Sequence, residues 1–275
     1  MNILKFFTYG KTSTFIYIAL ICFIFFGAGC INSKSGESEF IANPNVRFDP
    51  LLSVNVVNKY GSSSETELCE IVFSRTRDMQ SPFKRFRLYK NNVFELGGFG
   101  AGDEFYIGAF IDLDSNLSPS FGYEPVGGAY AEEAISLCQP PEVNFNDGKK
   151  ESAYKIIIKK DEVTKVELKM LRPITGRAPF NGALGLTTLP EFSWKAPAGI
   201  NAFKITVYGG EKANAYWQAL TYSEKIKYSI LSGNNDYALI PAALLPADSR
   251  HKWSLIGYDS QNDMWAYAPG YLFLP

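Results

Sequence analysis

The sequence contains a single histidine, His251, and its charges almost cancel. One histidine excludes a metal site with two or more histidine ligands and leaves one candidate for a histidine-based catalytic triad. The 27 Lys and Arg residues against 28 Asp and Glu residues give a net charge of −1. A dedicated nucleic-acid binder needs a basic surface to displace counterions from phosphates, so this balance argues against nucleic acid as a partner.

Sequence motifs of several enzyme classes are also missing. There is no G-x-S-x-G elbow, no phosphate-binding P-loop and no C-x-x-C pair. The glycine-dense run 97–102 precedes an expected strand, so it presents no helix N-terminus to a phosphate. His251 lies in an expected strand beside Trp253, where we expect a packed rather than a catalytic side chain. The sequence therefore predicts a protein that is not an enzyme.

Residues 1–29 have the features of a secretory signal peptide. Lys5 and Lys11 come first, an unbroken apolar run follows over 15–26, and no acidic residue precedes Cys30. The lysines favour the cytoplasmic side of a membrane while the apolar run enters the bilayer. The alternatives are an uncleaved transmembrane helix, a signal cleaved elsewhere and a buried core helix. Segment 14–29 is shorter than the ~20 residues of a membrane span.

The end of this segment resembles the lipobox of bacterial lipoproteins. Ala28, Gly29 and Cys30 match its last three positions, whereas Gly27 stands where Leu is usual. The resemblance implies cleavage before Cys30 and lipidation of that cysteine, so that acyl chains such as palmitate join the protein to a membrane. Stable anchoring requires at least two such chains.

The residues after Cys30 suggest a tether and a destination. The polar stretch 32–39 predicts that 30–45 is a flexible connection. Ile31 stands where some Gram-negative lipoproteins carry an aspartate, and by resemblance to their sorting rules this favours the outer membrane or the cell surface. We expect a membrane-anchored lipoprotein of the cell envelope.

The cysteines suggest one disulfide. Cys22 lies in the signal and Cys30 is assigned to the lipid, which leaves Cys69 and Cys138. An even pair in an oxidising compartment predicts a bridge between them. Closing a loop of this length would contribute roughly 4 kcal/mol. The alternatives are two buried free thiols or a metal site, for which two cysteines are too few.

The chain after residue 45 shows little helical periodicity and many short runs of β-branched and aromatic residues. This pattern predicts an all-β protein with two β-sandwich domains in tandem. Two segments, 129–138 and 213–220, read as short helical turns. The expected strands are 52–60, 68–74, 83–90, 104–112, 153–160, 163–171, 191–195, 202–209, 225–231, 237–240, 252–259 and 264–268.

A change in composition near 172–190 divides the body of the chain. This segment is rich in Gly and Pro and poor in strand-forming residues. We interpret 173–185 as a linker between a first domain, 46–172, and a second domain, 186–275.

The second domain resembles a fibronectin type III or related immunoglobulin-like sandwich. The resemblance rests on four segments: 189–194 (LPEFSW), 202–207 (AFKITV), 244–246 (LLP) and 251–259 (HKWSLIGYD). His251 and Phe203 stand where the family often has Tyr. Alternation places Phe192 and Trp194 on one face of a strand, as the buried Trp of that family requires.

The first domain resembles exported prealbumin-like sandwiches, which include carboxypeptidase-regulatory-like domains. Tyr106 and the segment 109–112 match the strand of the family motif, and 122–127 matches its later Gly-Glu-Pro segment. Leu117 replaces the usual Gly. The resemblance implies a strand that runs into an acidic loop.

This acidic loop is the best candidate site in the sequence. Asp112, Asp114 and Asn116 alternate and Glu124 follows, a pattern that can converge oxygen ligands on a Ca²⁺ ion. It is not an EF-hand, because Leu117 occupies the position that requires Gly. The alternative is a turn in which the acidic side chains accept hydrogen bonds from nearby backbone N–H groups. No cofactor other than Ca²⁺ is suggested.

Aromatic residues offer a second candidate site. Trp217 and Trp265, with the tyrosines around them, could form an exposed platform for a carbohydrate or a protein, or they could fill a sandwich core. The basic residues Lys84, Arg85 and Arg87 read as a solvated strand face.

The sequence thus predicts a lipid-anchored envelope protein that binds, adheres or scaffolds without catalysis. Loops at the ends of the sandwiches would bind the partner, because the strands form a rigid scaffold and the loops can vary in sequence and shape. The alternative is a Ca²⁺-dependent or carbohydrate-binding domain attached to an envelope hydrolase function.

Overall fold

The structure is a computed structural model that describes residues 51–59, 68–89, 93–140, 152–209, 215–231, 236–247 and 249–275. These residues belong to one compact unit, Phe48–Pro275. The expected signal peptide 1–29, the lipidated Cys30 and the tether 30–45 lie outside the described residues. Among the residues described, no helix has the length and hydropathy needed to cross a membrane.

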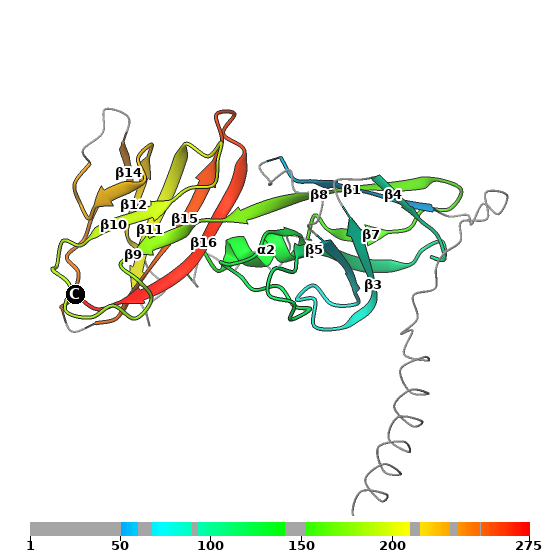
Figure 1. The fold of residues 1–275 in the computed structure, drawn as a ribbon, viewed down its shortest axis with the longest axis horizontal. Coiled ribbons are helices and arrows are strands. Elements are labelled where there is room, and N and C mark those ends of the chain that lie inside the picture. The colour runs from blue at the N-terminus through cyan, green and yellow to red at the C-terminus, as the bar shows by residue number, and fades with distance from the viewer. Residues whose placement is uncertain are drawn as a thin grey trace, which may run out of the picture. The chain divides into compact units, whose positions relative to one another are not determined.

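The N-terminal lobe combines strands with a short helix that covers one of its sheets (Figure 1). In chain order its elements are β1 (Leu51–Val57), β2 (Leu68–Ser74), β3 (Pro82–Tyr89), β4 (Val93–Leu96), β5 (Glu104–Ile111), β6 (Val126–Gly128), α2 (Ala129–Ser136), β7 (Lys155–Ile157) and β8 (Val163–Pro173). β2 lies between β3 and β5, while β1 lies between β4 and β8.

The sheet around β2 is buried on both faces, because side chains of a strand alternate between its two sides. Cys69, Ile71 and Phe73 point into a core shared with β1 and β8. Val72 points the other way, into a second core that includes residues of α2. The N-terminal lobe therefore has two hydrophobic layers separated by one sheet.

Helix α2 begins where the backbone passes very close to β5. Gly128 has φ 64°, and a Cβ atom at this position would lie 2.5 Å from the backbone oxygen of Ile107. Only glycine avoids both the strained backbone and the clash. This close approach lets Ala129 and Ala134 pack into the core beneath the helix.

The C-terminal lobe is a β-sandwich. Its strands are β9 (Thr175–Ala178), β10 (Glu191–Lys195), β11 (Ala202–Gly209), β12 (Ala215–Thr221), β13 (Lys225–Lys227), β14 (Tyr237–Ile240), β15 (His251–Tyr258) and β16 (Met264–Phe273). One sheet has the order β14-β12-β11-β15-β16, and the other has the order β13-β10-β9.

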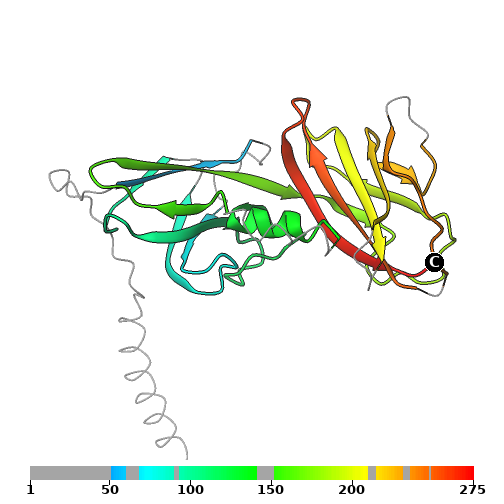
Figure 2. The ribbon, with the colours of Figure 1, turned by 180° about the vertical axis from the view of Figure 1, so that it is seen from behind.

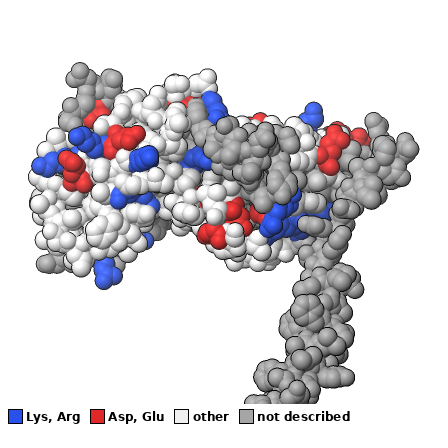
Figure 3. Space-filling view, in the orientation of Figure 1, with Lys and Arg blue, Asp and Glu red and all other residues white. Residues whose placement is uncertain are grey.

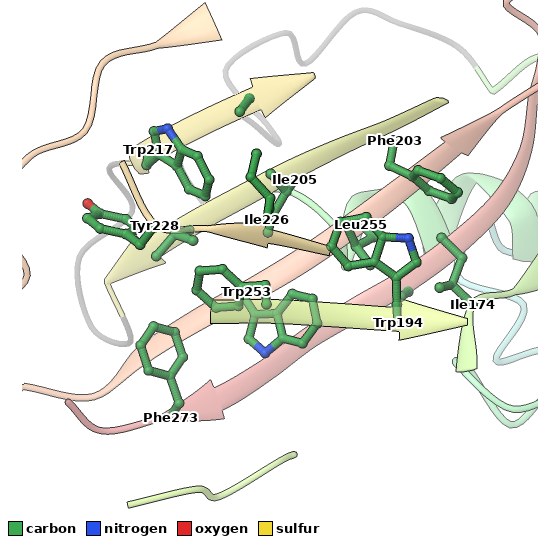
Figure 4. Close-up of a cluster of buried hydrophobic side chains, with 14 of the residues drawn as sticks. Ile174, Trp194, Phe203, Ile205, Trp217, Ile226, Tyr228, Trp253, Leu255 and Phe273 are labelled. Atoms are coloured by element: carbon green, nitrogen blue, oxygen red, sulfur yellow. The ribbon is translucent and has the colours of Figure 1, made fainter. Parts of the chain in front are cut away.

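Aromatic side chains fill the space between these two sheets (Figure 4). Phe192 and Trp194 of β10 both point into this core, as alternation predicted. The Phe192 ring lies 4.9 Å from the Trp253 ring, and the Trp194 ring lies 5.2 Å from the Phe203 ring, measured between centroids. Buried aromatic residues of this size make a large hydrophobic contribution to stability.

Strand β8 belongs to both lobes (Figure 2). Its first part pairs with β1, and Leu171 pairs with Val126 of β6. Its last two residues, Arg172 and Pro173, pair with Ala266 and Tyr267 of β16. The hydrogen-bonded sheet is therefore continuous from one lobe to the other.

Residues 173–185, expected to be a linker, are partly ordered as strand. They contain β9, and Ile174 and Ala183 are buried in the core of the C-terminal lobe. Gly and Pro here shape a tight path rather than a free connection, because Gly176, Gly182 and Gly185 all have positive φ. The division into domains 46–172 and 186–275 stays a prediction.

The all-β fold is confirmed, and most expected strands coincide with observed ones within a few residues. The expected helical turn at 129–138 is the helix α2. The expected turn at 213–220 is wrong, since 215–221 is strand β12, in which Trp217, Ala219 and Thr221 are buried at every second position. Pairing with β11 selects the strand there. The short strands β4, β6 and β9 were not expected.

Candidate functional site

Loop 112–124 connects β5 to β6 and closes around one carboxylate. Glu124 Oε1 accepts hydrogen bonds from the backbone N–H groups of Leu113 (2.6 Å) and Asp114 (3.3 Å), and Oε2 accepts one from Ser120 (2.9 Å). Burial raises the pKa of the Glu124 carboxyl, although the same three N–H groups act in the opposite direction. Glu124 is fully buried. Its carboxylate supplies hydrogen-bond acceptors for loop N–H groups that are not paired in a sheet.

The two aspartates hold the outer part of the loop. Asp112 accepts hydrogen bonds from the backbone N–H groups of Asn116 (3.1 Å) and Leu117 (3.2 Å). Asp114 accepts hydrogen bonds from the side chains of Asn116 (2.9 Å) and Ser120 (2.8 Å). The acidic side chains thus act as turn-forming acceptors, which is the alternative that the sequence left open.

The loop brings three of the four predicted Ca²⁺ ligands together. One oxygen from each of Asp112, Asp114 and Glu124 lies within 4.8 Å of the others. The side-chain oxygen of Asn116 instead accepts a hydrogen bond from the backbone N–H of Ser118 (2.6 Å). Calcium takes about 6–8 oxygen ligands, and several oxygens of this cluster already accept hydrogen bonds. Calcium binding at this loop stays a prediction.

The base of the loop is bound to the C-terminal lobe. The Tyr267 hydroxyl donates a hydrogen bond to the backbone oxygen of Glu124 (2.8 Å) and accepts one from the backbone N–H of Gly122 (3.1 Å). Burial strongly raises the pKa of the Tyr267 hydroxyl. The hydroxyl therefore stays protonated over the physiological pH range and can donate its hydrogen bond to the backbone oxygen of Glu124.

Arg177 supports the same junction from β9. Its guanidinium donates a hydrogen bond to the backbone oxygen of Pro269 and stacks on the Tyr271 ring, 3.1 Å from the ring centroid. Arg177 is buried, and burial lowers the pKa of its guanidinium. No local sequence pattern indicated Tyr267 or Arg177, because their partners are more than ninety positions away in the chain.

The rigid loop still presents apolar side chains to solvent. Leu113, Leu117 and Tyr123 are about half exposed. Leu113 also lines a hollow of about 310 Å³ together with Pro125, Arg172 and Lys195 and their neighbours. A loop held by many internal hydrogen bonds that exposes large apolar groups can bind a partner without a large loss of its own conformational entropy.

The predicted aromatic platform is wrong. Trp217 and Trp265 are only 1% and 5% exposed. Trp217 packs against Phe192 and Tyr228 in the sandwich core (Figure 4). Trp265 is covered by Lys169, whose ammonium lies 4.1 Å from a ring centroid. Both follow the core alternative: Trp217 is one of the alternating buried residues of β12, and Trp265 packs into the same core from the start of β16, where residues 265–268 are all buried.

The predicted disulfide between Cys69 and Cys138 is also wrong, since both are free and buried. Cys69 lies on the face of β2 that packs toward β1, whereas Cys138 follows α2 in the layer on the opposite face. The sheet separates them. Burial raises the pKa of each thiol to about 12, so both are protonated at neutral pH.

His251 packs in the core, and the basic residues Arg85 and Arg87 of β3 form ion pairs. His251 is fully buried at the start of β15 and lies between the rings of Tyr216 and Phe273. Arg85 and Arg87 pair with the buried carboxylate of Glu70 on the adjacent strand. Charges of both signs are scattered among larger uncharged areas on the face in Figure 3.

No family model matches the sequence, and no curated protein matches it. The fold is similar to a DUF3823 family protein from Bacteroides ovatus, at 8% identity and a TM-score of 0.23, over 82% of this chain and 98% of that chain. It is also similar to the FN1–FN3 domains of chicken CNTN1, at 9% identity and a TM-score of 0.24, over 82% of this chain and 62% of that chain. A Bacteroides ovatus protein described as a candidate adhesin gives 8% identity and a TM-score of 0.22, over 78% and 80%.

Proposed function

We propose that this protein is a lipid-anchored component of the cell envelope that binds a partner protein through loop 112–124 and performs no catalysis. Its role would be binding, adhesion or scaffolding. One observation carries the binding part of the proposal. Hydrogen bonds to the Glu124 carboxylate hold the loop together, and the loop still exposes Leu113, Leu117 and Tyr123. Exposed apolar groups on a preorganised loop are typical of interaction sites.

Proximity-dependent crosslinking tests the binding site. A photoreactive phenylalanine analogue replaces Tyr123 in the full chain, and the same analogue replaces Tyr222 as the matched control. Both tyrosines are about half exposed, and Tyr222 lies in the C-terminal lobe away from the loop in sequence. We expect a discrete crosslinked protein from position 123 alone. Equal labelling from the two positions, or none at 123, would show that the loop is not the binding site.

The anchor is tested separately by intact mass. The lipobox-like segment and the polar residues after Cys30 support it. We expect the cellular product to begin at Cys30 and to carry the added mass of its acyl chains. The variant Cys30→Ser should lose that mass and leave the membrane fraction. An unmodified chain that retains Met1 would contradict the anchor without touching the binding loop.

A Ca²⁺-dependent binding domain is the second candidate, because three carboxylates approach within 4.8 Å in this loop. If Ca²⁺ binds there, millimolar Ca²⁺ should raise the Tm relative to EDTA, since a ligand that binds only the folded state stabilises it. Asp112→Asn should abolish that difference. Equal Tm values in Ca²⁺ and EDTA would remove this candidate.

A further inference from the structure

Strand β14 forms an outer edge of the C-terminal sheet (Figure 1). It pairs with β12, and on its other side no strand is paired with it among the described residues. An open edge presents a row of backbone N–H and C=O groups that can pair with a further strand.

The other outermost strands of the described sheets carry charged residues. β3 has Lys84, Arg85 and Arg87, and β13 has Lys225 and Lys227. Charged side chains oppose unwanted pairing, because adding a strand would desolvate them or bring like charges together. The outer strands β4 and β7 follow the same pattern, with Glu95 in β4 and Lys155 in β7.

β14 lacks this protection. Its sequence is Tyr-Ala-Leu-Ile, and the uncharged run continues to residue 247. Tyr237 and Leu239 are 54% and 51% exposed, and Leu244 is 90% exposed. A contiguous apolar segment on an open edge is a typical protein-interaction surface.

We propose that β14 pairs with β14 of a second copy of this chain, antiparallel, so that the sheet continues across a symmetric dimer. A two-fold interface brings the same patch of each copy together, and this patch has no charge that would repel its own copy. With Ala238 opposite Ala238 of the partner subunit, Tyr237 faces Leu239 of the partner subunit twice. Aromatic and aliphatic residues placed opposite each other stabilise antiparallel pairs.

The same register leaves the unfavourable residues outside. Asp236 faces Ile240 of the partner subunit, so the two aspartates do not meet. Pro241, which has no N–H to donate, falls beyond the paired segment. Within the run 237–246, Leu245 is buried and Ile240 is half-buried, so fewer than ten exposed residues per copy are supplied, against roughly 20–30 on each side of a standard interface. We therefore expect a weak dimer that dissociates on dilution.

Cysteine crosslinking of the full chain tests this arrangement. In the proposed register the two Ala238 Cα atoms lie about 4.5–5.5 Å apart, within the reach of a disulfide. Under mild oxidation in detergent, Ala238→Cys should form a covalent dimer at least tenfold faster than Val163→Cys, a matched exposed site in the N-terminal lobe outside loop 112–124. Equal rates at the two sites would overturn the proposal.

A charge on the edge provides the second arm. Adding Leu239→Lys to the Ala238→Cys chain should reduce crosslinking to the rate of Val163→Cys, because two lysines would then lie within the paired segment. The Tm should change little, since Leu239 is exposed. Sedimentation velocity of the full chain should show a dimer that becomes monomer on dilution. A chain that remains monomeric at high concentration would also overturn the proposal, without bearing on loop 112–124 or the anchor.

Discussion

At the scale of single residues, one buried carboxylate organises the candidate site. The Glu124 carboxylate accepts three hydrogen bonds from backbone N–H groups of its own loop, and its backbone oxygen accepts a hydrogen bond from the Tyr267 hydroxyl. Glu124 thus holds the loop with its side chain and joins it to the interior with its backbone oxygen. Its loss should therefore affect the shape of the loop before it affects the rest of the fold.

We expect Glu124→Gln to destabilise the protein by about 1–3 kcal/mol, because the amide N–H₂ group would face backbone N–H donors. Urea unfolding at neutral pH measures this difference. Glu162→Gln is the matched control, since Glu162 is exposed on the surface and should change the free energy of unfolding by less than about 0.5 kcal/mol. Equal effects of the two variants would contradict the role assigned to Glu124.

The buried thiols give a prediction about alkaline pH. Burial raises the pKa of Cys69 and Cys138 from 9.0 to about 12. A folded-state pKa above the unfolded value means that the stabilisation is complete below pH 9 and is lost as the pH rises toward 12. We expect the free energy of unfolding to fall over this range, and to fall less steeply in Cys69→Ala.

The same thiols should resist modification in the native state. At pH 8 a thiol reagent should label Cys69 and Cys138 only after denaturant is added, because a reactive thiolate needs access and a low pKa. The test uses a chain with Cys22→Ser and Cys30→Ser. Rapid labelling without denaturant, or a mass two hydrogens lower than the reduced chain, would contradict the buried free thiols.

At the scale of elements, β16 connects the loop to the C-terminal sandwich. Its Tyr267 hydroxyl contacts the loop at two backbone groups, while the strand pairs with β15 and with the end of β8. The loop is thus fixed to a strand of the other lobe rather than only to the strands that flank it in sequence.

We expect Tyr267→Phe to destabilise the protein by about 1–2 kcal/mol through loss of these two hydrogen bonds. Hydrogen exchange should become faster at Gly122 and at the neighbouring amides of the loop. The rates in β11 should stay unchanged, which makes that strand an internal control. Uniformly faster exchange in both places would indicate global destabilisation and not release of the loop.

At the scale of the whole molecule, the two lobes share hydrogen bonds and buried surface. β8 pairs with strands of both, and Ile256 and Tyr267 of the C-terminal lobe pack in the same core as Val72 and residues of α2. Ser254 donates a hydrogen bond to the backbone oxygen of Cys138 (2.6 Å). Neither lobe can lose its structure without exposing part of the other.

We therefore expect one cooperative unfolding transition. All four tryptophans lie in strands of the C-terminal lobe, whereas Cys69 lies in the N-terminal lobe. Tryptophan fluorescence and the accessibility of the Cys69 thiol should give the same midpoint in urea. Two separated midpoints would show that the lobes unfold independently.

Features that depend on neighbouring residues could be predicted from the sequence. Alternation of apolar residues located the long strands, such as 68–74 and 191–195, and placed Phe192 and Trp194 on a common buried face. The acidic pattern at 112–124 indicated a loop in which Asp and Asn side chains form turns. These features follow from strand geometry and turn chemistry, which operate over a few residues.

Features that depend on distant partners emerge only when the chain is folded. Residues 215–221 become a strand because β11 pairs with them, Trp217 and Trp265 are buried because other strands cover them, and Cys69 and Cys138 stay apart because a sheet lies between them. The contacts of Tyr267 and Arg177 join positions far apart in the chain. Local pattern carries no information on such pairings, because they form only when packing brings separate elements together.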